Sequence, residues 1–132
     1  MIVRNSSDLI GSERETVVAT WASRRMLLKK DGMGFSFHET IIFPGTETLI
    51  WYKHHLEAVF CVEGEGEVEL IPEGRVIKIE PGVMYALDQH DKHYLRAKTQ
   101  LRLVCVFNPP LTGAETHDAD GVYPAEAAAA GA

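Results

Sequence analysis

The stretch Trp51–Leu70, WYKHHLEAVFCVEGEGEVEL, decides the fold class of this chain. Two runs of strand-like composition, Glu57–Glu63 and Gly66–Ile71, flank a connection punctuated by glycine. Valine, isoleucine and aromatic residues bounded by glycine turns are typical of paired strands. The stretch therefore predicts a β-hairpin. The two histidines and the glutamate that precede it raise the question of a metal site.

The same pattern recurs along the chain, and a sustained helical period of 3.6 residues never appears. Turn-forming segments such as KKDGMG and FPGT separate most of the runs. The sequence therefore predicts an all-β domain, a small barrel or sandwich. The expected strands are Thr16–Trp21, Arg24–Leu28, Gly34–Phe43, Glu47–Tyr52, Glu57–Glu63, Gly66–Ile71, Arg75–Glu80, Val83–Leu87, His93–Ala97 and Leu101–Phe107.

Length and composition exclude several classes. The 132 residues suit one domain, and 45% hydrophobic residues are ordinary for a folded protein. A net charge of −6 argues against a nucleic-acid partner. No run is apolar enough for a signal peptide or a membrane span, so we expect a cytoplasmic protein with Cys61 and Cys105 as thiols. The alanine-rich residues 124–132 predict a disordered tail after a domain of residues 1–123.

Three candidate metal ligands lie at or near strand ends. Glu57 and His93 each begin an expected strand, and Tyr85 shares a strand face with Leu87. Carboxylate, imidazole and phenolate are all suitable donors for a divalent ion. In the alternative interpretation Glu57 is a solvated charge and Tyr85 is a core aromatic residue. Spacing alone leaves both interpretations open.

Two glycine-framed segments resemble the motifs of the cupin superfamily. Gly45, Glu57 and Gly64 match the first motif, and Gly82 and His93 match the second. The usual pair of histidines does not match, because His54 and His55 stand too close to Glu57. In the second motif, Asp88 replaces the usual proline, His90 the usual glycine and Ala97 the usual asparagine. The resemblance therefore implies a cupin barrel without the ordinary four-ligand site.

A closer resemblance covers nearly the whole chain. The segments MIVRN, YKHHLEAVFCVEGEGEVE, PGVMYALDQHDKHYLRA and CVFNPPLTGAETHDADGVY are similar to those of the ectoine synthases. This resemblance implies a single-domain cupin β-barrel of jelly-roll type. It also implies a hydro-lyase that closes N4-acetyl-L-2,4-diaminobutyrate into ectoine, a compatible solute, with loss of water. The cofactor that it implies is iron(II), Fe(II), and the implied assembly is a head-to-tail homodimer.

The resemblance also assigns roles to individual residues. It implies Glu57, Tyr85 and His93 as metal ligands. We expect Tyr52 and His55 to move protons, with Glu115 in support. Arg25 is expected to hold the substrate's carboxylate, and Leu111–Tyr123 is expected to form a lid. The implied substrate contacts are Trp21, Arg25, Thr40, Tyr52, His55, Leu87, Asp91, Cys105, Phe107, Glu115 and His117.

Other interpretations remain open at this point. Trp21, Phe107 and Cys105 are also ordinary core residues, and Arg25 is also an ordinary surface charge. His54 is expected to be a surface or packing histidine. A cupin that binds a small molecule without catalysis is the main alternative function. A metal-dependent oxygenase fits less well, because its usual site requires two histidines and one carboxylate.

Overall fold

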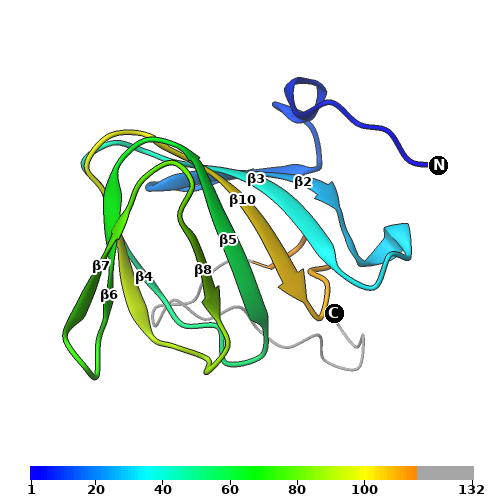
Figure 1. Ribbon diagram of the computed structural model, residues 1–132. Coiled ribbons are helices and arrows are strands. Elements are labelled where there is room, and N and C mark those ends of the chain that lie inside the picture. The colour runs from blue at the N-terminus through cyan, green and yellow to red at the C-terminus, as the bar shows by residue number, and fades with distance from the viewer. Residues whose placement is uncertain (116–132) are drawn as a thin grey trace.

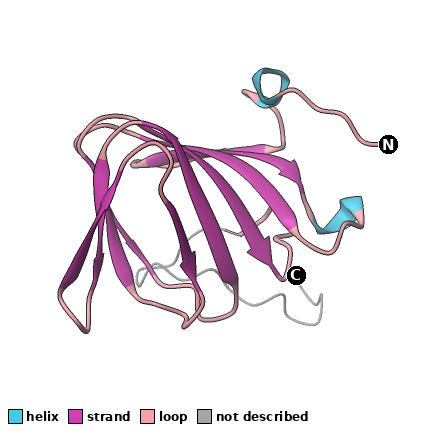
Figure 2. Cartoon of the chain, in the orientation of Figure 1, coloured by secondary structure: helices cyan, strands magenta, loops and turns pink. Residues whose placement is uncertain are grey.

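The computed structural model describes residues 1–115, and within them the chain forms ten strands in two antiparallel sheets (Figures 1 and 2). One sheet has the order β1-β2-β3-β10-β5-β8 and the other β4-β9-β6-β7. The strands are β1 (Glu15–Val17), β2 (Trp21–Leu27), β3 (Ser36–Ile42), β4 (Glu47–Ile50), β5 (Leu56–Glu63), β6 (Gly66–Leu70), β7 (Arg75–Ile79), β8 (Met84–Leu87), β9 (His93–Ala97) and β10 (Leu101–Asn108).

The core lies between the inner faces of the two sheets. Along β5, Glu57, Val59 and Cys61 are buried while the residues between them are exposed. Strand β10 alternates in the same way, with Leu101, Leu103, Cys105 and Phe107 buried. This period of two is what strands with one buried face require. The all-β barrel predicted from the sequence is confirmed.

One predicted strand is wrong in its extent. The run Thr16–Trp21 is interrupted at residues 18–20, where a tight turn joins β1 to β2 and the Val18 amide donates to the Trp21 carbonyl at 2.9 Å. Trp21 thus begins β2 instead of ending the strand before it. The turn contains no glycine, asparagine or proline, so the sequence carries no strong turn signal there.

The connection between β5 and β6 depends on its glycine. Gly64 has a φ of 96°, and a Cβ atom there would collide with the Gln100 carbonyl. Only glycine adopts this backbone conformation at so close an approach without strain. The hairpin predicted for the opening stretch is wrong, because β5 pairs with β10 and β8 whereas β6 pairs with β7 and β9 in the other sheet. The glycine marks a tight connection between the two sheets.

Two short 3-10 helices, Ser6–Leu9 and Lys29–Asp31, lie outside the barrel. Asp31 accepts hydrogen bonds from the Leu28 amide, Arg4 and Arg14 at 2.9–3.2 Å. This carboxylate joins the N-terminal segment to the end of β2. No helix among residues 1–115 is long and apolar enough to cross a membrane.

Candidate active site

A pocket opens between the sheets, and half of the predicted site residues line it. Strands β2, β3, β5, β8 and β10 line it together with Tyr52 from the β4–β5 connection, and β4 and β9 contribute Ile50 and Leu95. The lining residues are Trp21, Ser23, Thr40, Ile42, Ile50, Tyr52, Glu57, Val59, Tyr85, Leu95, Leu103, Cys105 and Phe107.

Strand register brings Glu57, Tyr85 and Cys105 together. The neighbour of Tyr85 on β5 is Val59, and Val59 also pairs with Cys105 on β10. Glu57 lies two residues before Val59 and therefore on the same inner face. The Cys105 thiol lies 3.6 Å from the hydroxyl of Thr40 on β3. Four strands thus place acidic or polar side chains on one wall of the pocket.

Burial makes negative charge costly on this wall. It raises the pKa of the Glu57 carboxyl to about 8, and a hydrogen bond with Cys105 opposes the shift only in part. Burial and the neighbouring Glu57 charge raise the pKa of the Tyr85 phenol well above its ordinary value. A bound cation would relieve both costs at once.

His93, the first residue of β9, is fully buried. Its Nδ1 atom lies 2.9 Å from the Asp91 carbonyl oxygen, which can only accept, so Nδ1 carries a proton. Burial lowers the pKa of the imidazole, although Asp91 opposes the shift. The neutral ring therefore presents a lone pair on Nε2, a buried atom with no hydrogen-bond partner among residues 1–115.

These donors fit a metal ion. The ring of His93 lies 6.5 Å from that of Tyr85, centroid to centroid, and Tyr85 in turn lies near Glu57. Hydrogen bonding of one imidazole nitrogen to a carbonyl leaves the other free to bind a metal. Within residues 1–115, no three His, Cys, Asp or Glu side chains form such a cluster. The Tyr85 oxygen is therefore the third candidate donor beside Glu57 and His93.

Tyr52 and His55, in the connection between β4 and β5, are both buried beside Phe107. The rings of Tyr52 and Phe107 are 5.1 Å apart, and those of His55 and Phe107 are 6.1 Å apart, both edge to face. Burial lowers the pKa of His55, while the charge of Glu115 raises it. His54 is exposed, as expected. The connection therefore brings the phenol of Tyr52 to the pocket wall and a neutral imidazole to the neighbouring Phe107.

Glu115 lies in the segment that follows β10. Its carboxylate accepts hydrogen bonds from the Thr112 amide and hydroxyl and from the Gly113 amide, all at 2.8–3.0 Å. Burial raises the pKa of this carboxyl, but these hydrogen bonds outweigh it and the net shift is downward. Glu115 is therefore a fixed negative charge close to His55.

Similar proteins identify the family. The family model described as ectoine synthase matches residues 1–127. The L-ectoine synthase of Desulfatibacillum aliphaticivorans is 64% identical over 94% of this chain and 97% of its own length.

The chain belongs to the ectoine synthase family.

Membership in this family makes the chain an enzyme of the carbon–oxygen lyase class. The L-ectoine synthase of Bordetella petrii is 63% identical over 98% of this chain and all of its own length. A crystal structure of ectoine synthase from P. lautus superposes with a TM-score of 0.86 at 60% identity, covering 92% of this chain and 87% of that one. An RmlC-like cupin from Shewanella frigidimarina, at 18% identity and a TM-score of 0.60, covers 72% of this chain and 81% of its own, and supports the cupin fold alone.

Arg25 anchors the segment after β10 in this family member. It is 1% exposed, and it donates from Nε to the Ser23 hydroxyl at 3.2 Å and from Nη1 to the Gly113 carbonyl at 3.0 Å. Its buried Nη2 has no hydrogen-bond partner among the described residues. The interpretation of Arg25 as a surface charge is therefore wrong.

Six predicted residues within the described part of the chain do not line the pocket: Arg25, His55, Leu87, Asp91, His93 and Glu115. Leu87 is buried on β8 and lines a separate hollow together with Asp91. The Asp91 carboxylate accepts from the Gln89 amide at 3.2 Å, within its own loop. Their contacts with substrate stay predictions. His117, the tail and most of the expected lid lie outside the described residues.

The sequence analysis did not predict Ser23 and His38, which lie close to Arg25 on β2 and β3. His38 is buried, with Nε2 2.9 Å from the Ser36 hydroxyl and Nδ1 3.4 Å from the Ser23 hydroxyl. Burial, with a smaller effect from Arg25, lowers its pKa to about 3, so the ring is neutral. Strand alternation could have predicted Ser23, because it lies between Trp21 and Arg25 on one face of the strand.

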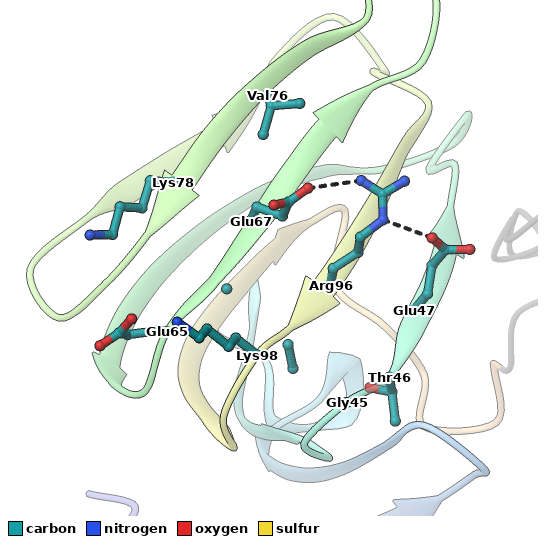
Figure 3. Close-up of a pocket in the computed structure, with 11 residues that line it drawn as sticks. Gly45, Thr46, Glu47, Glu65, Glu67, Val76, Lys78, Arg96 and Lys98 are labelled. Carbon is teal, nitrogen blue, oxygen red and sulfur yellow. Dashed lines mark hydrogen bonds and ion pairs between the residues drawn. The ribbon is translucent and has the colours of Figure 1, made fainter.

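A second hollow lies on the outer face of the sheet β4-β9-β6-β7 (Figure 3). Its central residue Arg96 pairs with Glu47, Glu67 and Glu69 at 2.7–2.9 Å, and these hydrogen bonds raise the pKa of the guanidinium. Three carboxylates surround the guanidinium, and the hollow contains none of the predicted site residues. The candidate active site is therefore the pocket between the sheets.

Proposed function

We propose that this enzyme forms L-ectoine from N4-acetyl-L-2,4-diaminobutyrate by intramolecular cyclisation with loss of water, and that it requires iron(II). Membership in the ectoine synthase family supports the reaction. The observation that carries the proposal is a donor set of the buried Glu57 and His93 with the half-buried Tyr85, next to a pocket that also holds Tyr52.

Glu57, Tyr85 and His93 would hold the iron. The chemistry that the ion supplies when bound is Lewis-acid polarisation of the substrate's amide carbonyl. Because burial disfavours the Glu57 and Tyr85 anions, the empty donor set is protonated at neutral pH, and loading the site releases protons. His93 needs no such change, because its Nε2 already carries a lone pair.

Tyr52 and His55 would perform the proton transfers, with Glu115 in support. The substrate's α-amine must be neutral to attack, and the neutral imidazole of His55 would accept a proton from that nitrogen. The Glu115 carboxylate stabilises the resulting imidazolium. The Tyr52 hydroxyl would then donate a proton to the departing oxygen, which leaves as water. In all, the carbonyl oxygen would take up two protons, both lost from the attacking nitrogen and passed on through His55 and Tyr52, and a carbon–nitrogen double bond would replace the carbon–oxygen double bond.

Positioning of the substrate would come from Arg25 and the aromatic walls. The unpartnered Nη2 of Arg25 is a buried donor suited to a carboxylate. Trp21 and Phe107 form the apolar walls, so the folded substrate would replace water in the pocket. Holding the two ends of one molecule together supplies effective concentration.

The direct test is to purify the protein without oxygen, load it with iron(II), add the substrate and measure ectoine by chromatography. We expect product only from the loaded protein, and folded, loaded protein that makes none contradicts the proposal. Glu57→Ala and His93→Ala should lose both iron and turnover, whereas His54→Ala, next to the site but exposed, should keep both. Tyr52→Ala should keep iron and lose rate.

We also propose a cytoplasmic, head-to-tail homodimer. Strand β8 is the edge of its sheet, and Leu56, Phe60 and Met84 on β5 and β8 are 40–60% exposed. Open strand edges with apolar neighbours are usually covered. Light scattering during size exclusion would measure the mass, and a monomer at micromolar concentration would contradict the dimer.

A further inference from the structure

His90 adopts a backbone conformation that is unusual for its residue type. Its φ is 52°, and it is the only non-glycine residue with positive φ in the part of the chain that the structure describes. This left-handed region costs roughly 1–2 kcal/mol for most residues with a Cβ, although asparagine, aspartate and histidine enter it more readily. The position corresponds to the glycine of the second cupin motif. A histidine in this conformation needs interactions that offset the strain of its backbone.

These interactions are two hydrogen bonds of opposite direction. The Nδ1 atom of His90 lies 2.8 Å from the Tyr52 carbonyl oxygen, so it carries the proton and donates. In return, Trp51 donates from Nε1 to the His90 carbonyl at 3.1 Å. We call this pair of hydrogen bonds the clasp. It joins the β4–β5 connection to the β8–β9 connection, both at the lower end of the barrel in Figure 1.

Each of the two joined connections carries a residue of the site. The first carries Tyr52, whose buried ring packs against Phe107. The second leads into His93, whose Nδ1 donates to the carbonyl of Asp91, the residue after His90. The clasp therefore fixes the backbone of Tyr52 relative to the loop that orients His93. The His90 side chain itself is exposed, so it adds little to the core.

We propose that His90 is a positioning residue that holds Tyr52 at the pocket wall through the clasp. This inference rests on the proposed function, in which Tyr52 transfers a proton. His90 touches neither the substrate nor the reacting atoms. A loosened clasp would leave the pocket present but place the Tyr52 hydroxyl less accurately, which lowers the rate of the chemical step more than substrate binding.

Three substitutions separate the hydrogen bond from the backbone conformation. His90→Asn keeps a donor near the position of Nδ1 and tolerates positive φ, whereas His90→Asp has the same shape but only acceptors. His90→Gly removes the side chain and relieves the strain. We expect kcat within about threefold of the wild type for Asn and about tenfold lower for Asp and Gly, with KM changed less than about twofold. His54→Asn serves as the exposed control in the neighbouring loop.

Hydrogen exchange gives a readout that needs neither metal nor substrate. Residues 51–55 and 88–92 should both exchange faster in the Asp and Gly variants than in the wild type, and the Asn variant should resemble the wild type. Thermal stability of the Gly variant should stay within a few degrees of the wild type, because strain relief offsets the lost bond. Equal kcat and equal exchange in all three variants would overturn the inference. An inactive wild type would instead contradict the proposed function.

Discussion

Arg25, in the middle of β2, donates a hydrogen bond to the carbonyl oxygen of Gly113, a residue 88 positions later in the chain, over 3.0 Å. The same guanidinium donates to the Ser23 hydroxyl and leaves Nη2 buried without a partner among residues 1–115. One planar group thus fixes the segment after β10 and keeps a buried donor available. Lysine cannot do both, because its ammonium is a single point on a flexible stem.

We therefore expect Arg25→Lys to lower kcat/KM by about 100-fold, which corresponds to about 2.7 kcal/mol for the lost charge-assisted hydrogen bonds. Most of the loss should appear in KM, since the substrate carboxylate loses its forked partner. Steady-state kinetics on the iron-loaded enzyme would measure it.

The matched control is Arg24→Lys. Arg24 pairs with Glu15 and Glu39 at 2.9–3.2 Å on the opposite face of β2, away from the pocket. Its substitution should leave kcat/KM within about twofold of the wild type. Similar losses for both variants would mean that Arg25 acts through the stability of β2 and not through the substrate.

Tyr85→Phe should remove iron from a protein that still folds. The substitution deletes one oxygen atom and keeps the ring in its place on β8 beside His93. Because burial makes the Tyr85 anion costly, the metal-free variant should melt no lower than the metal-free wild type. Iron content by mass spectrometry and calorimetry of the metal-free proteins would test this. Tyr94→Phe, whose ring lies 5.2 Å from the Arg96 guanidinium carbon, is the control. Full iron content in Tyr85→Phe would exclude the phenol as a ligand.

Strand alternation explains why much of the pocket could be predicted. On β5, β8 and β10, every second residue faces inward, because each strand has one buried face. Glu57, Tyr85 and Cys105 lie at these inward positions. The same rule would have added Ser23, which lies between two predicted residues. The family resemblance was needed for Tyr52 and His55, because both lie in a connection where no period applies.

Other features depend on contacts that no local pattern contains. The hydrogen bond from Arg25 to Gly113 and the clasp at His90 each join residues far apart in the chain. Glu115 was expected to assist proton transfer, but its hydrogen bonds to Thr112 and Gly113 were not visible from spacing. Such bonds depend on the loop conformation, which tertiary packing decides.

Asp31→Asn should destabilise the protein at neutral pH but not at pH 2. The Leu28 amide, followed by Arg14 and Arg4, lowers the pKa of the Asp31 carboxyl to about 2 against the opposing effect of burial. The folded-state pKa is below the unfolded value, so this stabilisation is complete above about pH 4 and is lost as the pH falls towards 2. The variant should lose about 1–3 kcal/mol of unfolding free energy at pH 7.

Urea unfolding from pH 2 to 7 would measure the difference between Asp31→Asn and the wild type. The two curves should converge at the acid end. Asp8→Asn, at an exposed site in the first 3-10 helix, should track the wild type throughout. A difference that stays constant with pH would show that Asp31 acts through packing and not through its charge.

Glu115→Gln should shift the pH dependence of catalysis towards lower pH. Burial lowers the pKa of His55, and the Glu115 charge partly restores it, so removing that charge lowers the pKa of the imidazole further. If His55 is the base, the acid limb of the kcat profile moves down in pH, because protonation of His55 inactivates the enzyme there. At neutral pH, kcat should fall by about tenfold, because His55 becomes a weaker base and its protonated form is no longer stabilised by the Glu115 charge. Glu80→Gln, an exposed residue paired with Lys78, is the control for the lost charge. A lower kcat with an unshifted acid limb would assign Glu115 to holding Thr112 and Gly113, and the base would then be a residue other than His55.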